Sequence, residues 1–404
     1  MTATPGAAAL GTDRGDRMPV TSGAVLGVLA DGGGIDFARL RAWRRDRLFT
    51  AMDDQAVDAL MLGRGANIEY ASGARQLWVA GTRPFGPACV VVRATRRVHL
   101  LSVWDDGVPP EVPHEDLYGL SWNPANLFAS LHAIPGLADA ARLGTDSFAP
   151  GFDQFIGALA PRAEVLDGRA VLGPARAVKS PDELECIRTA TAIAEAGLEA
   201  LVDHLRPGMT ERQLLGAYLG RIASLGAPTP PVESVVCATP RHGPVALRHL
   251  VSDRPVGAGE LVVLNPGAMY AGYEGGVGRT WVCPRAPSAA QVALATRCHE
   301  GMRAVIELCR PGRTGSDLRR AWEVTGAPLP AAPLVHGLGL GMEPPVIAPG
   351  VGDDAVVSAG MVLAVQGWVA APGVGGFLER EVVAVGHDGA ELVSAASPGP
   401  VRTA

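Results

Sequence analysis

Hydrophobic and polar positions change their spacing several times along the first half of the chain. From Asp36, the stretch DFARLRAWRRDRLFTAMDDQ places apolar residues three and four positions apart, which predicts an amphipathic helix. VDALMLG predicts a short buried strand, and ACVVVRATRRVHLLSV predicts a hairpin with a basic turn. We expect NIEYASGA, between them, to form a turn that leads into a strand. A helix near residues 123–137 and a strand near 141–145 would complete a first α/β unit.

The second half begins with a strong helix-start signal. Ser180 precedes Pro181, and Glu183 stands three residues on, which is the pattern of a capping box with proline at the first helical position. Further helix starts are indicated at Thr210 with Gln213, at Ser288 and at Thr314. The strand-like runs among and after these helices are VESVVCAT, ELVVLNPG, GRTWVCP, MVLAVQGWVAA and EREVVAVG. The pattern of two helices and a hairpin occurs twice, which predicts a duplicated ααββ unit with a mixed sheet covered by helices.

The predicted fold class is therefore α/β with two domains, and composition fits it. The expected divisions are a flexible tail over 1–34, an N-terminal α/β domain over 35–175 and a C-terminal domain over 176–404. Of the 404 residues, 48% are hydrophobic and 19% are charged, which is typical of a well-buried globular enzyme. The net charge of -6 gives no electrostatic reason to expect a nucleic-acid partner.

The cellular location of the protein and the redox state of its cysteines are inferred from sequence features that are missing. No apolar run approaches the roughly 18 residues that a membrane-spanning helix needs. The first 34 residues lack the order of a signal peptide, so we expect a cytoplasmic protein with no membrane association. The six cysteines include no C-x-x-C pair, and we expect them to be reduced, mostly buried thiols. Lys179 is the only lysine, which is typical of a GC-rich genome.

Five motifs occur together in an order that resembles a known family. They are VKSPDELECIRTATAIAE, LRPGMTERQL, SDRPVGAGELVVLNPGAMYAGYEGGVGRT, VHGLGL and SAGMVLAV. Their order and spacing are similar to those of the creatinase, prolidase and aminopeptidase P family. The resemblance implies a C-terminal domain with the pita-bread fold. It also implies a homodimer in which the partner subunit's N-terminal domain completes the site.

The resemblance also implies a metal site, and this chain departs from it. Peptidase members hold two divalent ions with two aspartates, one histidine and two glutamates. The matching positions here are Asn265, Gly276, His336, Gln366 and a position on or beside Arg380. Two adjacent divalent ions need several negatively charged oxygen ligands, and this set supplies too few. We therefore expect no dinuclear metal site and no cofactor.

Creatinase is a metal-free member of the family, and several residues match its site. The asparagine in LNPGAMYAGY is similar to the one in creatinase, where peptidases have aspartate. Glu379 matches a glutamate that binds the guanidinium of creatine, whereas the second such glutamate falls on Gly278. Arg83 resembles the arginine that binds the substrate carboxylate from the partner subunit, and Phe85 beside it is a further candidate contact. The missing glutamate makes creatine itself an unsuitable substrate.

Three histidines compete for the acid/base role. By the peptidase register, His249 falls on the family's histidine position, whereas the creatinase register places Arg248 there, one residue earlier. We favour His249, because a loop absorbs a one-residue shift readily. His336 precedes Gly-Leu-Gly-Leu and is a second candidate for catalysis. His242, on a Gly-Pro loop, is a rival candidate that would lie near the mouth of the site.

The segment LERE contains an ambiguity that the sequence does not resolve. Alternation along a strand places Glu379 and Glu381 on one face and Arg380 on the other. An inward Arg380 would imply an anionic substrate, and an inward Glu379 would imply a cationic one; we slightly favour Glu379. Other candidate substrate contacts are Tyr273 and Glu274 in the hairpin, with Asn265 and Gln366, whose amides could bind a substrate amide or each other.

We therefore predict a metal-independent, creatinase-like hydrolase. It would act on a C–N bond of a small amidino, amide or amino-acid-derived substrate, and we expect a role in secondary metabolism. In the expected mechanism His249 deprotonates a water molecule, and His336 or protonated His249 delivers a proton to the departing nitrogen. Two alternatives remain open: a pita-bread protein that binds a ligand without turnover, and an Xaa-Pro peptidase-like metallohydrolase with an atypical site.

Overall fold

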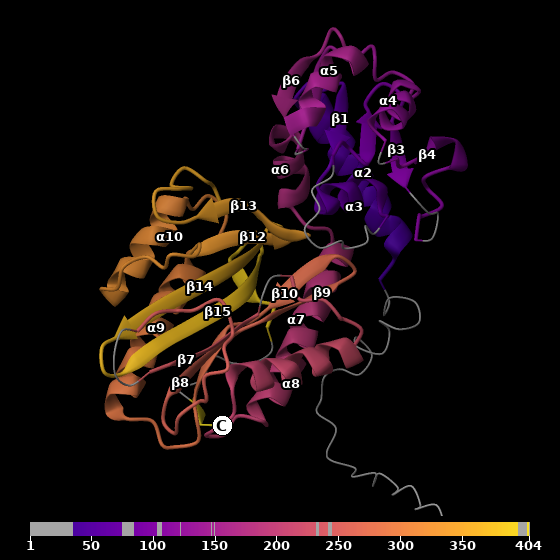
Figure 1. Ribbon diagram of the computed structural model, residues 1–404. Helices are drawn as coiled ribbons and strands as arrows, with labels where there is room; N and C mark the ends of the chain where they lie inside the picture. Colours follow the sequence, from indigo (N-terminus) through magenta and orange to yellow (C-terminus); the bar gives the residue numbers. More distant parts are fainter. Residues whose placement is uncertain are drawn as a thin grey trace, which may run out of the picture.

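The computed structural model of the protein describes residues 35–74, 85–102, 107–121, 123–146, 148, 150–231, 234–240, 245–394 and 402–403. The chain forms two α/β domains, as the pattern predicted (Figure 1). In Figure 1 the N-terminal domain is indigo to magenta and stands above one end of the larger C-terminal domain.

The N-terminal domain contains a six-stranded sheet in the order β4-β3-β2-β1-β5-β6. Its strands are β1 (Ala59–Leu62), β2 (Cys89–Val92), β3 (Arg97–Ser102), β4 (Leu117–Gly119), β5 (Arg142–Thr145) and β6 (Glu164–Asp167). Its helices are α2 (Phe37–Asp54), α3 (Gly65–Ser72), η1 (His114–Asp116), α4 (Pro124–His132), η2 (Pro150–Phe152), α5 (Asp153–Leu159) and α6 (Arg169–Ala177). Strands β2 and β3 pair antiparallel, which confirms the predicted hairpin.

One local prediction in this domain is wrong. The segment NIEYASGA was expected to be a turn and strand, but most of it belongs to helix α3. The carboxylate of Asp146 accepts hydrogen bonds from the backbone amides of Gly63 (2.7 Å) and Arg64 (3.0 Å), just before the helix begins. A distant acid thus satisfies amides near a helix start, where local sequence offers no capping side chain.

The C-terminal domain contains most of the strands that the motifs predicted. Its helices are α7 (Pro181–Val202), α8 (Glu211–Ser224), α9 (Ala289–Glu307), α10 (Gly315–Trp322) and η3 (Glu323–Thr325). Its first strands are β7 (Val235–Thr239), β8 (Leu261–Asn265), β9 (Gly267–Tyr270), β10 (Tyr273–Gly276) and β11 (Arg279–Val282). The later strands are β12 (Val335–Gly339), β13 (Gly341–Ile347), β14 (Val362–Ala371), β15 (Gly375–Val385), β16 (Ala390–Leu392) and β17 (Arg402–Thr403).

Two sheets and a separate hairpin make up the strands of this domain. The sheets have the orders β17-β11-β8-β7 and β13-β12-β14-β15-β16, and β9 pairs only with β10 among the described strands. Helices α7 and α8 lie beside the strands of the first half of this domain, and α9 and α10 lie beside those of the second half (Figure 1). Backbone hydrogen bonds of 3.0 Å in both directions between Gly278 and Arg380 join the two halves of the duplicated unit.

The sequence signals for helix starts in this domain are confirmed. Ser180, Thr210, Ser288 and Thr314 are each an N-cap residue in a capping box. The expected boundary between residues 175 and 176 falls within α6, which contacts both α2 and β13. All six cysteines are buried free thiols, as expected. Within the described ranges, no helix is both long and apolar enough to span a bilayer.

Candidate functional site

The strands of the C-terminal domain bring the positions of the family metal site together. Asn265 ends β8, Gln366 lies on β14, and Arg380 lies directly opposite Gln366 on β15. The Asn265 Nδ2 atom donates a hydrogen bond of 2.8 Å to Gln366 Oε1. The two amides therefore bind each other, which is one of the two arrangements that the sequence left open.

A buried ion pair occupies the same region. The Arg380 Nη2 atom donates to Glu274 Oε1 at 2.7 Å, and both residues are 5% exposed. Glu274 lies on β10, whereas Arg380 lies on the long strand β15. Glu274 therefore lies among these residues, and its partner is Arg380, on or beside which the sequence resemblance placed the fifth metal-ligand position.

The structure also explains why glycine stands at position 276. A Cβ atom there would lie 2.9 Å from the carbonyl oxygen of Pro266 and 3.0 Å from the Cα of Gly267, the residue opposite in the hairpin. The same Cβ would lie 3.5 Å from Arg380 Nη1. The close approach of β9 to β10 and the guanidinium thus fill the space that an aspartate side chain would need.

These residues do not fit a pair of divalent ions. Asn265 and Gln366 are neutral amides that bind each other, and Arg380 places a positive charge between the strands. Among the residues that the structure describes, no three His, Cys, Asp or Glu side chains are grouped in a way that could hold an ion. A guanidinium next to the ligand positions adds repulsion where a metal centre needs negative charge.

His336 is the histidine that the fold brings to this region. It is a buried residue on β12, and its Nδ1 atom lies 2.9 Å from the carbonyl oxygen of Gly337. Burial and the positive charge of Arg380 lower the pKa of His336, which keeps the ring neutral near pH 7. A neutral ring that donates from Nδ1 leaves Nε2 as the basic nitrogen.

Strand alternation is confirmed at LERE, but the orientation that we favoured is wrong. Glu379 points away from Arg380's face, toward helix α9, where its carboxylate oxygens lie 3.4 Å from His299 Nδ1. Glu381 is on the same side and pairs with Arg279 at 2.9 Å. Arg380 faces inward because Glu274, on the hairpin, supplies the opposite charge there.

His249 makes no hydrogen bond or ion pair with these residues. It is exposed on the loop before β8, and it forms no hydrogen bond with any residue that the structure describes. Its neighbour Arg248 turns inward instead and binds the carboxylate of Glu211 on α8. Arg248 is thus the anchored residue of this loop, and His249 is left exposed. The candidates Arg83 and His242 lie outside the described residues.

Two further candidate contacts have other partners. Phe85 packs edge-on against Phe152 and Phe155 within the N-terminal domain, at ring-centroid distances of 5.8 and 6.2 Å. Tyr273 precedes Glu274 but points to the other side of β10, where its hydroxyl donates to Glu183 Oε1 at 2.6 Å. The predicted substrate contact by Tyr273 is therefore replaced by a contact at the junction between the domains.

A second buried ionic cluster, missed in the sequence, lies beside the site. Glu343 on β13 binds Lys179 Nζ at 2.8 Å and Arg176 Nη2 at 2.6 Å. Its strand pairs with β12 at Gly337, next to His336. The signal in the sequence was Lys179, the one lysine of the chain. In the structure its ammonium also donates to the carbonyl oxygens of Arg176 and Ala177.

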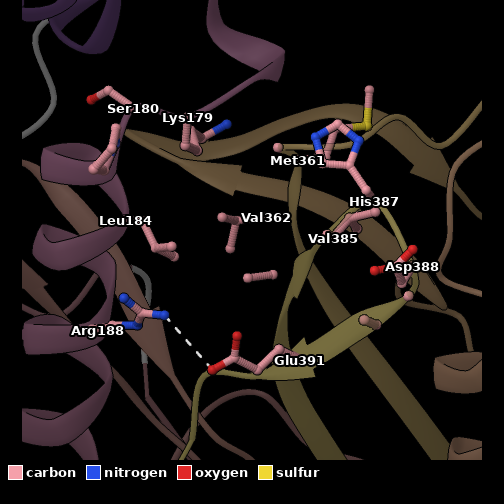
Figure 2. Close-up of a pocket in the computed structure, with 16 residues that line it drawn as sticks. Lys179, Ser180, Leu184, Arg188, Met361, Val362, Val385, His387, Asp388 and Glu391 are labelled. Atoms are coloured by element: carbon pink, nitrogen blue, oxygen red, sulfur yellow. Dashed lines mark ion pairs between the residues drawn. The ribbon is translucent and has the colours of Figure 1, made fainter.

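A groove of about 650 Å³ lies elsewhere, between the start of α7 and the turn from β15 to β16. Figure 2 shows Arg188 and Glu391 facing each other across it, with His387 and Met361 on another side. The Arg188–Glu391 pair is long, at 3.8 Å; the Glu391 side chain is largely exposed and that of Arg188 partly exposed. None of the predicted site residues lines this groove.

Comparison with known proteins agrees with this architecture. The sequence model of metallopeptidase family M24 matches residues 185–387, half of the chain. The Xaa-Pro dipeptidase of Pyrococcus furiosus is 24% identical over 367 residues, which cover 87% of this chain and 97% of that protein. The probable dipeptidase PepE of Mycobacterium tuberculosis is 29% identical over 301 residues, covering 72% and 73%.

Solved structures show the same fold. The dipeptidase PepE of Mycobacterium ulcerans superimposes with a TM-score of 0.76 at 22% identity and covers 91% of this chain and 98% of its own. The prolidase of Pyrococcus horikoshii gives a TM-score of 0.73 at 20% identity, covering 88% and 98%. With half of its length matched by the family model, the chain belongs to metallopeptidase family M24.

Proposed function

We propose that this protein hydrolyses a C–N bond of a small peptide-like or amino-acid-derived substrate without a dinuclear metal centre. The substrate class follows the relatives, which are named as dipeptidases and Xaa-Pro dipeptidases. The observation that carries the metal-independent part is the buried Glu274–Arg380 ion pair among the family's ligand positions. Its guanidinium stands where bound cations would need room and negative charge.

The proposed chemistry uses His336 and Arg380. The neutral His336 ring takes a proton from a water molecule at Nε2, and the hydroxide attacks the carbonyl carbon of the scissile amide. The negative charge that develops on the tetrahedral intermediate is stabilised by the guanidinium of Arg380. When the C–N bond breaks, the departing nitrogen takes the proton back from His336.

The neighbouring amides would orient the substrate in this proposal. The Asn265 Nδ2–Gln366 Oε1 contact uses one half of each amide. Asn265 Oδ1 is buried and accepts no hydrogen bond from the described residues. It is therefore suited to accept an N–H group of the substrate, because a buried acceptor without a donor is costly.

A second candidate function is ligand binding without turnover. One observation in its favour is that His249 is exposed. Among the described residues, the ligand positions then have one histidine, His336, where the expected mechanism used two. Binding without turnover is also favoured by the pairing of Glu274 and Arg380, because Glu274 offsets the positive charge that would stabilise a developing negative charge on the substrate. Such a protein would bind the same class of substrate at the same residues.

One experiment separates these functions. The purified protein is analysed for bound metals and then incubated with a panel of Xaa-Pro dipeptides and amino-acid amides, with and without EDTA. Turnover that EDTA leaves unchanged supports the proposal. Turnover that requires added manganese, cobalt or zinc would overturn it in favour of an atypical metallohydrolase. Saturable binding without turnover would favour the second candidate.

A pair of histidine variants sharpens the test. H336Q is expected to lower kcat by roughly 100-fold or more, because it removes the basic nitrogen. H249Q is expected to change kcat by less than about threefold, since substitutions at exposed positions outside the site have small effects. The reverse order would restore His249 as the acid/base, as the sequence alone had favoured.

The remaining expectations belong to the same proposal. We propose that the protein is a cytoplasmic homodimer whose site is completed by the partner subunit's N-terminal domain, with a role in secondary metabolism. Light scattering after size-exclusion chromatography would test the dimer directly.

A further inference from the structure

We infer that Tyr273 is a positioning residue: its contacts with the docked N-terminal domain fix the hairpin that carries Glu274, and so fix where Glu274 meets Arg380. The inference rests on the proposed function in one respect, since it takes this pair as part of the site. Tyr273 and Glu274 are consecutive residues of β10, and their side chains point to opposite sides of the strand. A rigid contact on one side therefore fixes the side chain on the other.

The contacts of Tyr273 join three elements at one buried hydroxyl. The hydroxyl donates to Glu183 Oε1 on α7 at 2.6 Å and accepts from Arg44 Nε on α2 at 2.9 Å. The Arg44 guanidinium also lies over the Tyr273 ring, 4.9 Å from its centroid. The other oxygen of Glu183 accepts from the backbone amide of Ser180 at 2.8 Å, which fixes the carboxylate. Tyr273 is thus clamped between the N-terminal domain and the first helix of the C-terminal domain.

The turn of the same hairpin supports this contact. At Gly272, φ is +80°, and a Cβ atom there would collide with the carboxylate of Glu69 on α3. Helix α3 therefore rests on the tip of the β9–β10 hairpin, next to Tyr273. Among the described strands β9 pairs only with β10, so no wider sheet fixes this hairpin at its other edge. A backbone hydrogen bond from Met269 to Thr229 (3.3 Å) and the bonds between Gly278 and Arg380 hold the two ends of the hairpin. The side-chain contacts of Tyr273 and the close approach of Glu69 to Gly272 add to these near the turn.

The geometry makes Tyr273 separable from domain docking itself. Arg44 Nε lies 3.9 Å from Glu183 Oε1, and the Tyr273 hydroxyl bridges the two. If the hydroxyl is removed, the guanidinium and carboxylate can pair directly, because opposite buried charges attract at this distance. The variant Y273F should therefore keep the N-terminal domain docked and release the hairpin alone.

The test uses the full-length protein and measures amide hydrogen exchange by mass spectrometry. In Y273F we expect exchange about tenfold faster over residues 266–278 and 378–381, with no change over residues 37–54 of α2. Y270F is the matched control. It makes the same chemical change on the opposite strand of the same hairpin, at a tyrosine with no hydrogen bond to the described residues. It should exchange like the unaltered protein.

Two outcomes would overturn the inference. In one, Y273F and Y270F give the same exchange at the hairpin. In the other, α2 is released together with the hairpin, which would reduce Tyr273 to a general docking contact. E183Q keeps an oxygen acceptor for the Tyr273 hydroxyl and should restrain the hairpin better than Y273F does.

The exchange result does not depend on catalysis, so it separates this inference from the proposed function. If the unaltered protein shows no turnover but Y273F alone releases the hairpin, the proposed hydrolysis fails and the positioning role stands. If turnover is found, Y273F should lower kcat with a smaller change in KM. The substitution would shift Glu274 and Arg380 from their positions but would leave the residues that bind the substrate in place.

Discussion

Two buried glutamates, Glu274 and Glu343, whose charges both act on His336, are used differently. Glu343 receives hydrogen bonds on both oxygens: from Arg176 Nε (3.0 Å) and Nη2 (2.6 Å), the amide of Leu340 (3.1 Å) and Lys179 Nζ (2.8 Å). Glu274 receives one hydrogen bond from the described residues, from Arg380. Both oxygens of Glu343 thus accept hydrogen bonds, and they hold the linker between the two domains, at Arg176 and Lys179, to β13. Glu274 keeps one oxygen without a hydrogen bond from the described residues.

This difference distinguishes a structural cluster from a candidate site. Burial by itself would raise the pKa of Glu343, but Lys179 and Arg176 outweigh it and hold the pKa below its ordinary value. Every strong donor there is already used within the protein. At Glu274 and Arg380, one contact leaves further donors and an acceptor, which a polar substrate could engage. The following substitutions test whether the two clusters really differ in this way.

The largest effect is expected for E343Q. The substitution leaves Lys179, whose side chain is 2% exposed, without its counter-charge. We expect the free energy of unfolding to fall by about 3–5 kcal/mol, measured by urea denaturation with circular dichroism. E391Q is the control, because its pair with Arg188 is exposed, and it should cost less than about 1 kcal/mol. Equal effects for both would show that the Glu343 cluster does not hold the linker.

A smaller effect, with a different signature, is expected at Glu274 and Arg380. R380M or E274L alone leaves one buried charge unpaired and should cost about 2–4 kcal/mol of unfolding free energy. The double variant E274L/R380M removes both charges and should be more stable than R380M. If the double variant instead loses the sum of the two single effects, the pair is not energetically coupled.

The smallest effect concerns pH and the outer face of β15. The hydrogen bond to Glu379 raises the pKa of His299 above its ordinary value near 6.5. A raised histidine pKa stabilises the fold below the unfolded pKa, and this contribution is lost as pH rises through the folded value. His299 is 45% exposed, so screening limits the contribution to less than about 1 kcal/mol.

The measurement is unfolding free energy between pH 5 and pH 9 for the unaltered protein and H299Q. The difference between them should be largest at the acidic end and shrink toward pH 9. A difference that stays constant across this range would show that the His299–Glu379 contact is not an ion pair.

Local signals in the sequence predicted the helices of the C-terminal domain and their order. Capping boxes at Ser180 and Thr210 depend on residues three positions apart. At Ser180 the box uses one oxygen of Glu183, and the distant Tyr273 binds the other, so both contacts form together. The segment NIEYASGA was misassigned for the opposite reason. The acid that binds the amides before its helix, Asp146, is 82 residues away from Arg64, so no local pattern shows it.

The candidate site divides in the same way. The sequence by itself determined that the family's two aspartate positions hold Asn265 and Gly276, and that Glu379 and Arg380 must face opposite sides of a strand. Only the tertiary structure decided which of them faces inward, because the answer depends on Glu274, more than a hundred residues earlier, supplying the opposite charge. It also decided that Tyr273 belongs to the domain junction, since Arg44 and Glu183 meet it from separate helices. Local geometry makes side chains alternate between the two faces of a strand. Which face turns inward depends on the oppositely charged partner that the fold brings to it, because a buried charge is costly without one.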